Sequence, residues 1–204
     1  MEKTTRRTIQ AAGTRDVIVD AAGRLFAAEG YVRTTIDAIA AESGVAVQTV
    51  YNSVGNKAAL LSAVLDKAAA GPGGQAGVLD FMRERTRQAA DFNALIAVLA
   101  DWFVEVHPRT AGTNTVIAQA AAVDDTAAQL EKDRGQQRLR RYAEAAAAVR
   151  TRGGLSSGMS DAEGAAAIWS LGHPQVYRAL VQDSGWSVPA YREWIAKALA
   201  GALA

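Results

Sequence analysis

Two amide side chains stand four residues apart in the stretch of sequence with the most potential for specific contacts. Gln48 and Asn52 would lie on one face of a helix. Each carries the paired hydrogen-bond donor and acceptor that can bind the major-groove edge of adenine. Val47, at the start of the same helix, could contact a thymine methyl. The spacing therefore predicts that Val47, Gln48 and Asn52 read bases in double-stranded DNA.

Hydroxyl groups and one ammonium group flank these three residues. They are suited to phosphate oxygens, which fix the register of a protein on DNA without reporting its sequence. The predicted phosphate contacts are Thr35, Thr49, Tyr51 and Lys57. Asn56 is suited to cap the following helix, whose first amides could add a further phosphate site. For Tyr51 the alternative is packing against the preceding helix.

Two short helices and a tight turn must position these side chains. Thr35 is placed to cap the first helix, and Ile39 belongs to its buried face. Gly44 can adopt the left-handed backbone that ends a helix and reverses the chain. Val45 is expected to fill the angle between the helices, and Val50 to face the core behind them. The pattern predicts a helix-turn-helix unit, although the same pattern also occurs at simple packing corners.

The stretch TTIDAIAAESGVAVQTVYNSVGNKAALL, residues 34–61, resembles the DNA-binding domain of the tetracycline-repressor (TetR-like) family of bacterial transcriptional regulators. The resemblance extends upstream through RDVIVDAAGRLFAAEGY, residues 15–31, and residues 169–195 resemble the closing helices of one subgroup. It implies a homodimeric repressor whose carboxyl-terminal helical domain responds to a ligand. Ser53 and Val54 depart from the pattern, because the family often has an aromatic residue or His at the first position and Phe at the second.

The amino-acid composition is that of an ordinary globular protein. The 204 residues are 50% hydrophobic and 21% charged, with a formal net charge of +1, so attraction to DNA must come from the local placement of basic groups. The sequence holds no cysteine, which excludes disulfides and thiolate chemistry. It also shows no signal-peptide pattern at its start and no run long enough to span a bilayer. We expect a cytoplasmic protein without membrane contact.

Helical patterns throughout predict an all-α fold with two domains. Residues 1–13 are expected to form a flexible arm. Residues 14–70 should form a three-helix DNA-binding domain with its connecting helix, in which Thr14 caps a first helix that ends at Gly30. The glycine-rich residues 71–77 indicate a linker. Residues 78–204 should form a helical ligand-binding and dimerisation domain.

Capping residues and prolines divide the second domain into predicted helices. Asp91 is expected to begin a helix that Pro108 ends or kinks. Ser160 with Glu163 forms a capping box. The remaining predicted helices are Leu79–Ala90, Thr113–Val123, Asp125–Arg150, Pro174–Val181 and Pro189–Leu203.

The sequence contains no motif that supports a catalytic function. Residues 154–158, GLSSG, have the spelling of a hydrolase nucleophile elbow, but such an elbow must follow a strand, and a helical run precedes it here. The glycines of residues 71–77 likewise lack the strand and the Lys of a phosphate-binding loop. His107 and His173 are far apart, with no cysteine to complete a zinc site. We expect no enzyme activity, no metal and no cofactor.

The second domain instead offers aromatic side chains with a few polar groups, which suit a mostly apolar ligand. The candidate pocket residues are Phe81, Trp102, Phe103, Asn114, Gln119 and Trp169. Core packing is the alternative for each of them. The predicted function is a DNA-binding transcriptional regulator that a small molecule releases from its operator. The alternative is a helical ligand-binding or enzymatic protein that uses its first unit to dock on another protein.

Dimerisation is expected through the last helices, because one short helix-turn-helix contacts too few base pairs for useful specificity. The segment from Ala162 to Gln182 should form an isologous interface, with support from Pro189–Leu203. Small residues would allow close approach of the helices, namely Ala165, Ala166, Ala167 and Ala179.

Overall fold

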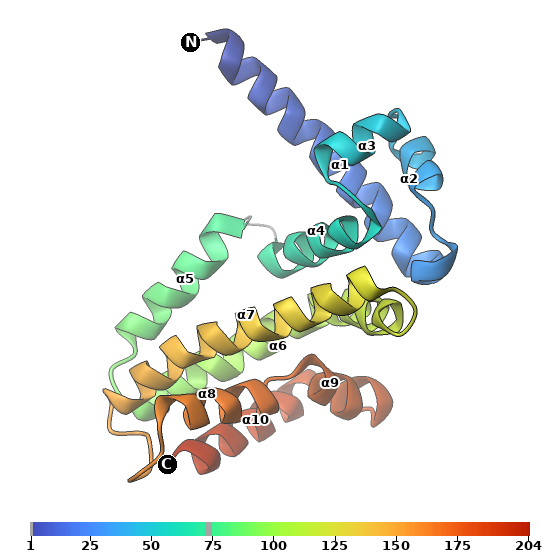
Figure 1. Cartoon of the computed structure of the whole chain (residues 1–204). Helices are drawn as coiled ribbons and strands as arrows, with labels where there is room; N and C mark the ends of the chain where they lie inside the picture. The colour runs from blue at the N-terminus through green and yellow to red at the C-terminus, as the bar shows by residue number, and fades with distance from the viewer. Residues whose placement is uncertain (1, 72–74) are drawn as a thin grey trace. The chain divides into compact units, whose positions relative to one another are not determined.

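The computed structural model describes residues 2–71 and 75–204, and in these ranges the chain forms helices and no strand (Figure 1). The predicted all-α fold is confirmed. Residues 72–74 of the predicted linker lie outside the described residues.

The chain forms two compact units. The first consists of residues 1–68 and 112–131, and the second of residues 69–111 and 132–204. The sequence had assigned residues 112–131 to the second domain. They join the first unit because Val116, Ile117, Ala120 and Ala127 are buried in its hydrophobic core.

Helix α1, Glu2–Arg33, differs from the prediction at its start. Residues 2–13, expected to be a flexible arm, continue the helix, since they contain no proline and are rich in Arg, Lys, Gln and Ala, which favour helix. Thr14 therefore lies inside the helix rather than at its cap. Gly30 interrupts α1 as predicted, with φ at 76°, a conformation that glycine adopts without strain.

Three shorter helices complete the amino-terminal part of the first unit. They are α2, Ile36–Ser43, α3, Val47–Ser53, and α4, Lys57–Ala70. Leu60, Leu61 and Leu65 of α4 are buried in one cluster with Ile18 and Phe26 of α1. These leucines of α4 thus contribute to the core of this unit.

The remaining helices follow in order along the chain. Their bounds are α5, Gln75–Gln88, α6, Phe92–Ala121, α7, Asp125–Arg150, α8, Asp161–Leu171, α9, Pro174–Tyr177, and α10, Val188–Leu203. A π-helical segment, Arg178–Asp183, extends α9. Asp91 caps α6 by accepting a hydrogen bond of 2.8 Å from the amide of Ala94. The capping box of Ser160 and Glu163 is present, so both predicted caps are confirmed.

Pro108 lies inside α6 and does not end it, so the first of the two predicted alternatives, an end or a kink, was wrong. The helices expected on either side of it are one helix, α6. Proline removes one hydrogen bond from a helix interior but does not prevent the helix from continuing. The next turn stays helical, and the hydroxyl of Thr110 donates a 2.9 Å hydrogen bond to the carbonyl of Val106.

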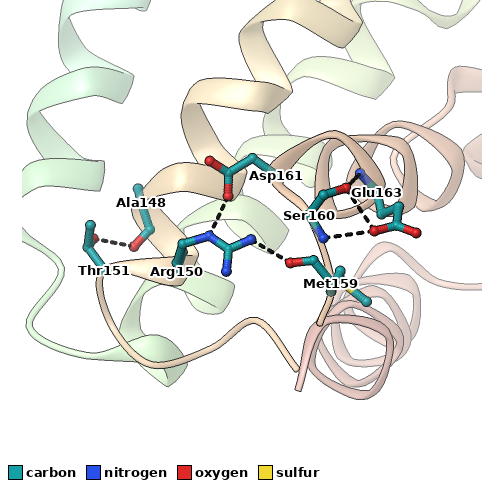
Figure 2. A network of polar contacts seen from close by, with 7 residues as sticks. All are labelled: Ala148, Arg150, Thr151, Met159, Ser160, Asp161 and Glu163. Atoms are coloured by element: carbon teal, nitrogen blue, oxygen red, sulfur yellow. Dashed lines mark hydrogen bonds and ion pairs between the residues drawn. The ribbon is translucent and has the colours of Figure 1, made fainter. Parts of the chain in front are cut away.

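Arg150, at one end of the loop between α7 and α8, binds residues at the other end of the loop (Figure 2). Its guanidinium donates to the Asp161 carboxylate at 2.7 Å and to the backbone carbonyl of Met159. The GLSSG residues belong to this loop between two helices, and helix α7 directly precedes the loop. The amide of Ser156 donates to the carbonyl of Leu203 at 3.0 Å. The loop therefore has a structural setting unlike that of a nucleophile elbow.

The core of the second unit combines aliphatic and aromatic side chains. Leu95, Phe103, Ile168, Tyr191 and Leu199 are fully buried in it. Within the described part of the chain, no helix is both long and apolar enough to cross a membrane.

Candidate nucleic-acid interface

The turn between α2 and α3 has the geometry that the sequence predicts. Thr35 Oγ1 accepts a 3.1 Å hydrogen bond from the amide of Ala38, which satisfies one of the free amides at the start of α2. Gly44 has φ at 69° and ends α2 in the left-handed conformation. The amide of Val45 then donates to the carbonyl of Ala40 at 3.0 Å.

Burial fixes which face of α3 is available to a partner. Val50 is fully buried and Ile39 of α2 packs in the same core, while Val45 is half-buried between the helices. On other faces of α3, Val47 and Tyr51 keep 36% and 48% of their surfaces exposed. A short helix with one buried anchor and exposed side chains on its other faces can enter the major groove of DNA.

Gln48 and Asn52 are exposed on α3 and bind each other. The Nε2 atom of Gln48 donates a 3.0 Å hydrogen bond to Oδ1 of Asn52. The pair therefore presents the Gln48 oxygen as an acceptor and the Asn52 amide group as a donor, which together match the donor and acceptor on the major-groove edge of adenine. Sequence spacing predicted that they share a face, but not that they form one unit.

The three hydroxyl residues predicted at phosphates lie around α3. Thr35 and Tyr51 are exposed, and Thr49 is half-buried. The hydroxyl of Thr35 accepts from the α2 backbone and keeps its own proton for donation to another acceptor. Asn56 caps α4 as predicted, since its Oδ1 accepts from the amide of Ala59 at 2.8 Å.

Lys57, the fourth predicted phosphate contact, already has partners inside the protein. Its Nζ atom lies 4.1 Å from the centre of the Tyr31 ring, a cation–π distance, and donates to the carbonyl of Val32 at 3.4 Å. Burial lowers the pKa of Lys57, and the negative charge of Asp124 partly opposes this. The ammonium group is thus held in place at the first turn of α4.

Tyr31 connects this ammonium group to Asp124. Its hydroxyl donates a 2.8 Å hydrogen bond to the Asp124 carboxylate. Burial first, and then this hydrogen bond, raise the pKa of Tyr31, while the hydrogen bond from Tyr31 lowers the pKa of Asp124. Asp124 also accepts from the amides of Thr126 and Ala127, which caps α7. The base of the helix-turn-helix is therefore tied to the start of α7.

Two arginines of α1 brace the helix-turn-helix, and the sequence reading missed both. Arg15 donates a 2.6 Å hydrogen bond to the carbonyl of Ser53 in the last turn of α3. Arg24 forms an ion pair of 2.9 Å with Glu42 of α2. Cations are favourable at the carboxyl end of a helix. The partners are 38 and 18 residues apart, so no local sequence pattern reports them.

The candidate pocket residues are divided between the two units. Phe103 is fully buried in the second core, and Trp102 and Trp169 are half-buried in the same unit. Asn114 and Gln119 belong to the first unit, where Gln119 is exposed. The side chain of Phe81 lies outside the described residues.

Comparison with known proteins agrees with this geometry. Residues 18–64 match the family model of bacterial regulatory proteins of the tetR family. No curated protein matches the chain.

Solved structures resemble the chain over nearly its whole length. A TetR-family transcriptional regulator from Syntrophomonas wolfei is 20% identical with a TM-score of 0.74, over 93% of this chain and 96% of its own. NalD, the secondary repressor of the MexAB-OprM multidrug efflux pump in Pseudomonas aeruginosa, is 18% identical with a TM-score of 0.72, over 95% and 97%. The complex of SmeT with triclosan is 23% identical with a TM-score of 0.70, over 93% and 91%.

The family model covers the helices that build the helix-turn-helix, and the structural likeness extends the same fold through the second unit. The amino-terminal unit thus contains a segment that matches the tetR family model, and the chain as a whole has the fold of the TetR-family regulators that it resembles.

Proposed function

We propose that the protein is a homodimeric repressor that binds a palindromic DNA operator and leaves it when a small molecule binds the second unit. The observation that carries this proposal is the exposure of the Gln48–Asn52 pair on α3 above the buried Val50. A hydrogen-bonded amide pair on a helix anchored from behind suits adenine in a major groove. We further propose that Val47 contacts a thymine methyl, and that Thr35, Thr49, Tyr51 and Lys57 contact phosphates.

Dimerisation would supply the second half-site. A single α3 helix of seven residues reads only a few base pairs, whereas a two-fold dimer places two such helices about one DNA turn apart. Of the small residues expected to form the interface, Ala166 and Ala179 are exposed, and Ala165 is buried in its own protomer. The dimer surface on α8 would therefore use the face that carries Ala166.

Helix α6 offers the route by which a ligand would act. Its residues up to Ala111 belong to the second unit, and its residues from Gly112 to the first. Val116 and Ile117 are buried in one cluster with Leu61 and Leu65 of α4. A ligand that favours a different position of α6 would therefore also bias α4 and the spacing of the two recognition helices. Among the similar proteins, NalD is a repressor and SmeT has been solved with triclosan.

The test is direct binding to DNA from the neighbourhood of the protein's own gene. Fluorescence anisotropy at two salt concentrations should reveal a specific complex that weakens steeply as salt rises. Gln48→Ala should reduce the preference for the specific site, while Gln88→Ala, a matched change on α5, should not. A folded protein that binds no DNA fragment would instead favour the alternative, in which the first unit docks on another protein.

The proposal includes a cytoplasmic protein that binds its effector without converting it. Effector recovered unchanged after prolonged incubation with the protein would agree with this, and any product formed at more than stoichiometric amounts would contradict it.

A further inference from the structure

A buried indole nitrogen in the second unit has no partner in the described structure. The Nε1 atom of Trp169, on α8, is shielded from solvent and donates no hydrogen bond to any described residue. Leaving such a donor unpaired is unfavourable, and native proteins do so rarely. The Trp169 indole lies against the His173 ring edge to face, with centroids 5.3 Å apart. The donor is thus part of a defined cluster rather than an isolated side chain.

His173 adds a second donor to this cluster. Its Nδ1 atom accepts a 3.2 Å hydrogen bond from the amide of Gln175, at the start of α9. In the neutral ring the proton then sits on Nε2, which makes that atom a donor. Burial, and then the charge of Arg138, lower the pKa of His173. The ring is therefore neutral at pH 7 and offers an N–H group.

Arg138, on α7, makes the surroundings electropositive. Its charge lowers the pKa of His107 and His173 and opposes the burial that raises the pKa of Tyr142 to about 12. Arg141 also acts on Tyr142 with a positive charge. Arg138 acts on all three rings and Arg141 on one of them, so these cations would stabilise a negative charge placed beside the rings.

Aromatic rings pack beside this cluster, since a Cβ atom added at Gly172, the residue before His173, would meet the Phe103 ring. Phe103 of α6 stacks on His107 with centroids 5.3 Å apart, and meets Tyr142 edge to face at 6.1 Å. Aromatic surfaces of this kind bind planar apolar groups. The region therefore combines N–H donors, positive potential and aromatic surface.

We propose that the effector is an aromatic carboxylate, whose oxygen accepts from Trp169 Nε1 while its charge faces Arg138 and its ring packs on the aromatic cluster. This inference rests on the proposed function, because it names the chemical class of the ligand expected in the second unit. Hydrogen bonds to charged acceptors are the stronger class, which explains how a buried indole donor would contribute to affinity.

The first test compares matched pairs of probes on the full-length wild-type protein. Benzoate and 2-naphthoate are titrated beside their neutral amides, benzamide and 2-naphthamide, at millimolar concentration and pH 7. Binding is followed through the indole ¹H–¹⁵N resonance of Trp169, assigned by its loss in Trp169→Phe. At least one carboxylate should move this resonance downfield and bind at least about tenfold more tightly than its amide. Equal binding of amide and acid, or no response to either acid, would overturn the proposal.

The second test removes each charge or donor in turn. Trp169→Phe retains a ring but loses the N–H group, and Arg138→Gln loses the positive charge; each should weaken carboxylate binding by about tenfold or more. Trp186→Phe, an exposed indole, and Arg140→Gln, two residues from Arg138 on an exposed position, are the matched controls and should not. Equal losses in controls and test variants would contradict the assignment.

DNA binding separates this inference from the proposed function. A carboxylate that binds through Trp169 and Arg138 but leaves the operator complex intact would support the ligand class and contradict release by ligand. The protein could also form the operator complex normally but bind the carboxylate and amide probes equally. That result would support the DNA-binding function and overturn the ligand class.

Discussion

The hydroxyl of Tyr31 donates a 2.8 Å hydrogen bond to the carboxylate of Asp124, 93 residues further along the chain. Tyr31 directly follows the break at Gly30, and Asp124 caps α7. The ammonium of Lys57 lies over the same Tyr31 ring. One tyrosine therefore holds together the end of α1, the start of α4 and the turn before α7, all within the first unit.

Removing either partner of this hydrogen bond should lower stability, and removing both should cost less than the two separate losses added. Tyr31→Phe deletes the donor, while Asp124→Asn keeps an oxygen for the α7 cap. We expect a coupling free energy of about 1 kcal/mol in a double-mutant cycle measured by urea denaturation. If the losses of the two single variants sum to the loss of the double variant within about 0.4 kcal/mol, the contact does not stabilise the unit.

Lys57→Ala should weaken binding to all DNA sequences by a similar factor. Its ammonium is held at the start of α4 near the recognition helix, so it can neutralise one phosphate. The slope of log affinity against log salt should then fall by about one. Lys67→Ala is the control, because Lys67 pairs with Asp20 at 2.8 Å in the last turn of the same helix. An equal change in both variants would argue against a phosphate contact at Lys57.

Gln48→Ala should relax base preference by about 1 to 3 kcal/mol at one position of the site. Because Gln48 and Asn52 hydrogen-bond each other, Asn52→Ala should alter preference at the same or the adjacent base pair. Selection of binding sites from a random DNA library measures both profiles. An unchanged profile for Gln48→Ala would mean that α3 docks differently. Asp37→Ala, an exposed residue of α2, provides a comparison away from α3.

Local rules predicted the helix-turn-helix because its signals lie within a few residues of one another. Thr35 caps the amide three residues on, and Gly44 supplies the left-handed turn. In the second unit, Ser160 with Glu163 closes a capping box that an equally short pattern predicted. These depend on backbone geometry that short sequence patterns encode.

Contacts between distant residues could not be predicted in the same way. Arg15 at Ser53 and Tyr31 at Asp124 depend on how helices pack, which no local spacing reports. Pro108 shows a second limit of local rules. His107 before it and Thr110 after it are buried, and a helix held by such packing tolerates one missing hydrogen bond. The membership of Val116 in the first core likewise follows from tertiary packing alone.

Gly172→Ala should destabilise the second unit, because an added Cβ atom would overlap the Phe103 ring, which is itself fully buried. Overpacking of this kind costs about 1 to 3 kcal/mol. Gly135→Ala, inside α7 with no atom within 4 Å of its added Cβ, should instead stabilise by about 0.5 to 1 kcal/mol. Thermal unfolding of both variants decides the matter, and equal midpoints for the two would contradict this packing.

His107 should make the protein less stable as the pH falls below neutrality. The ring is 3% exposed and packs against the rings of Tyr191, Tyr177 and Phe103. Burial lowers its pKa from 6.5 to about 4, with the charges of Arg138 and His173 acting in the same direction and a hydrogen bond to the backbone of Gly172 opposing them.

The sign follows from proton uptake. Between pH 6.5 and about 4 the unfolded chain binds a proton at this position and the folded chain does not, so the free energy of unfolding decreases as the pH falls through this window. The full difference corresponds to about 3 kcal/mol. His107→Gln keeps hydrogen-bonding capacity but cannot titrate there. In urea denaturation from pH 7 to pH 4, it should lose less stability than the wild type, by up to that amount. Parallel curves for the two proteins would show that His107 is protonated as readily in the folded chain as in the unfolded one.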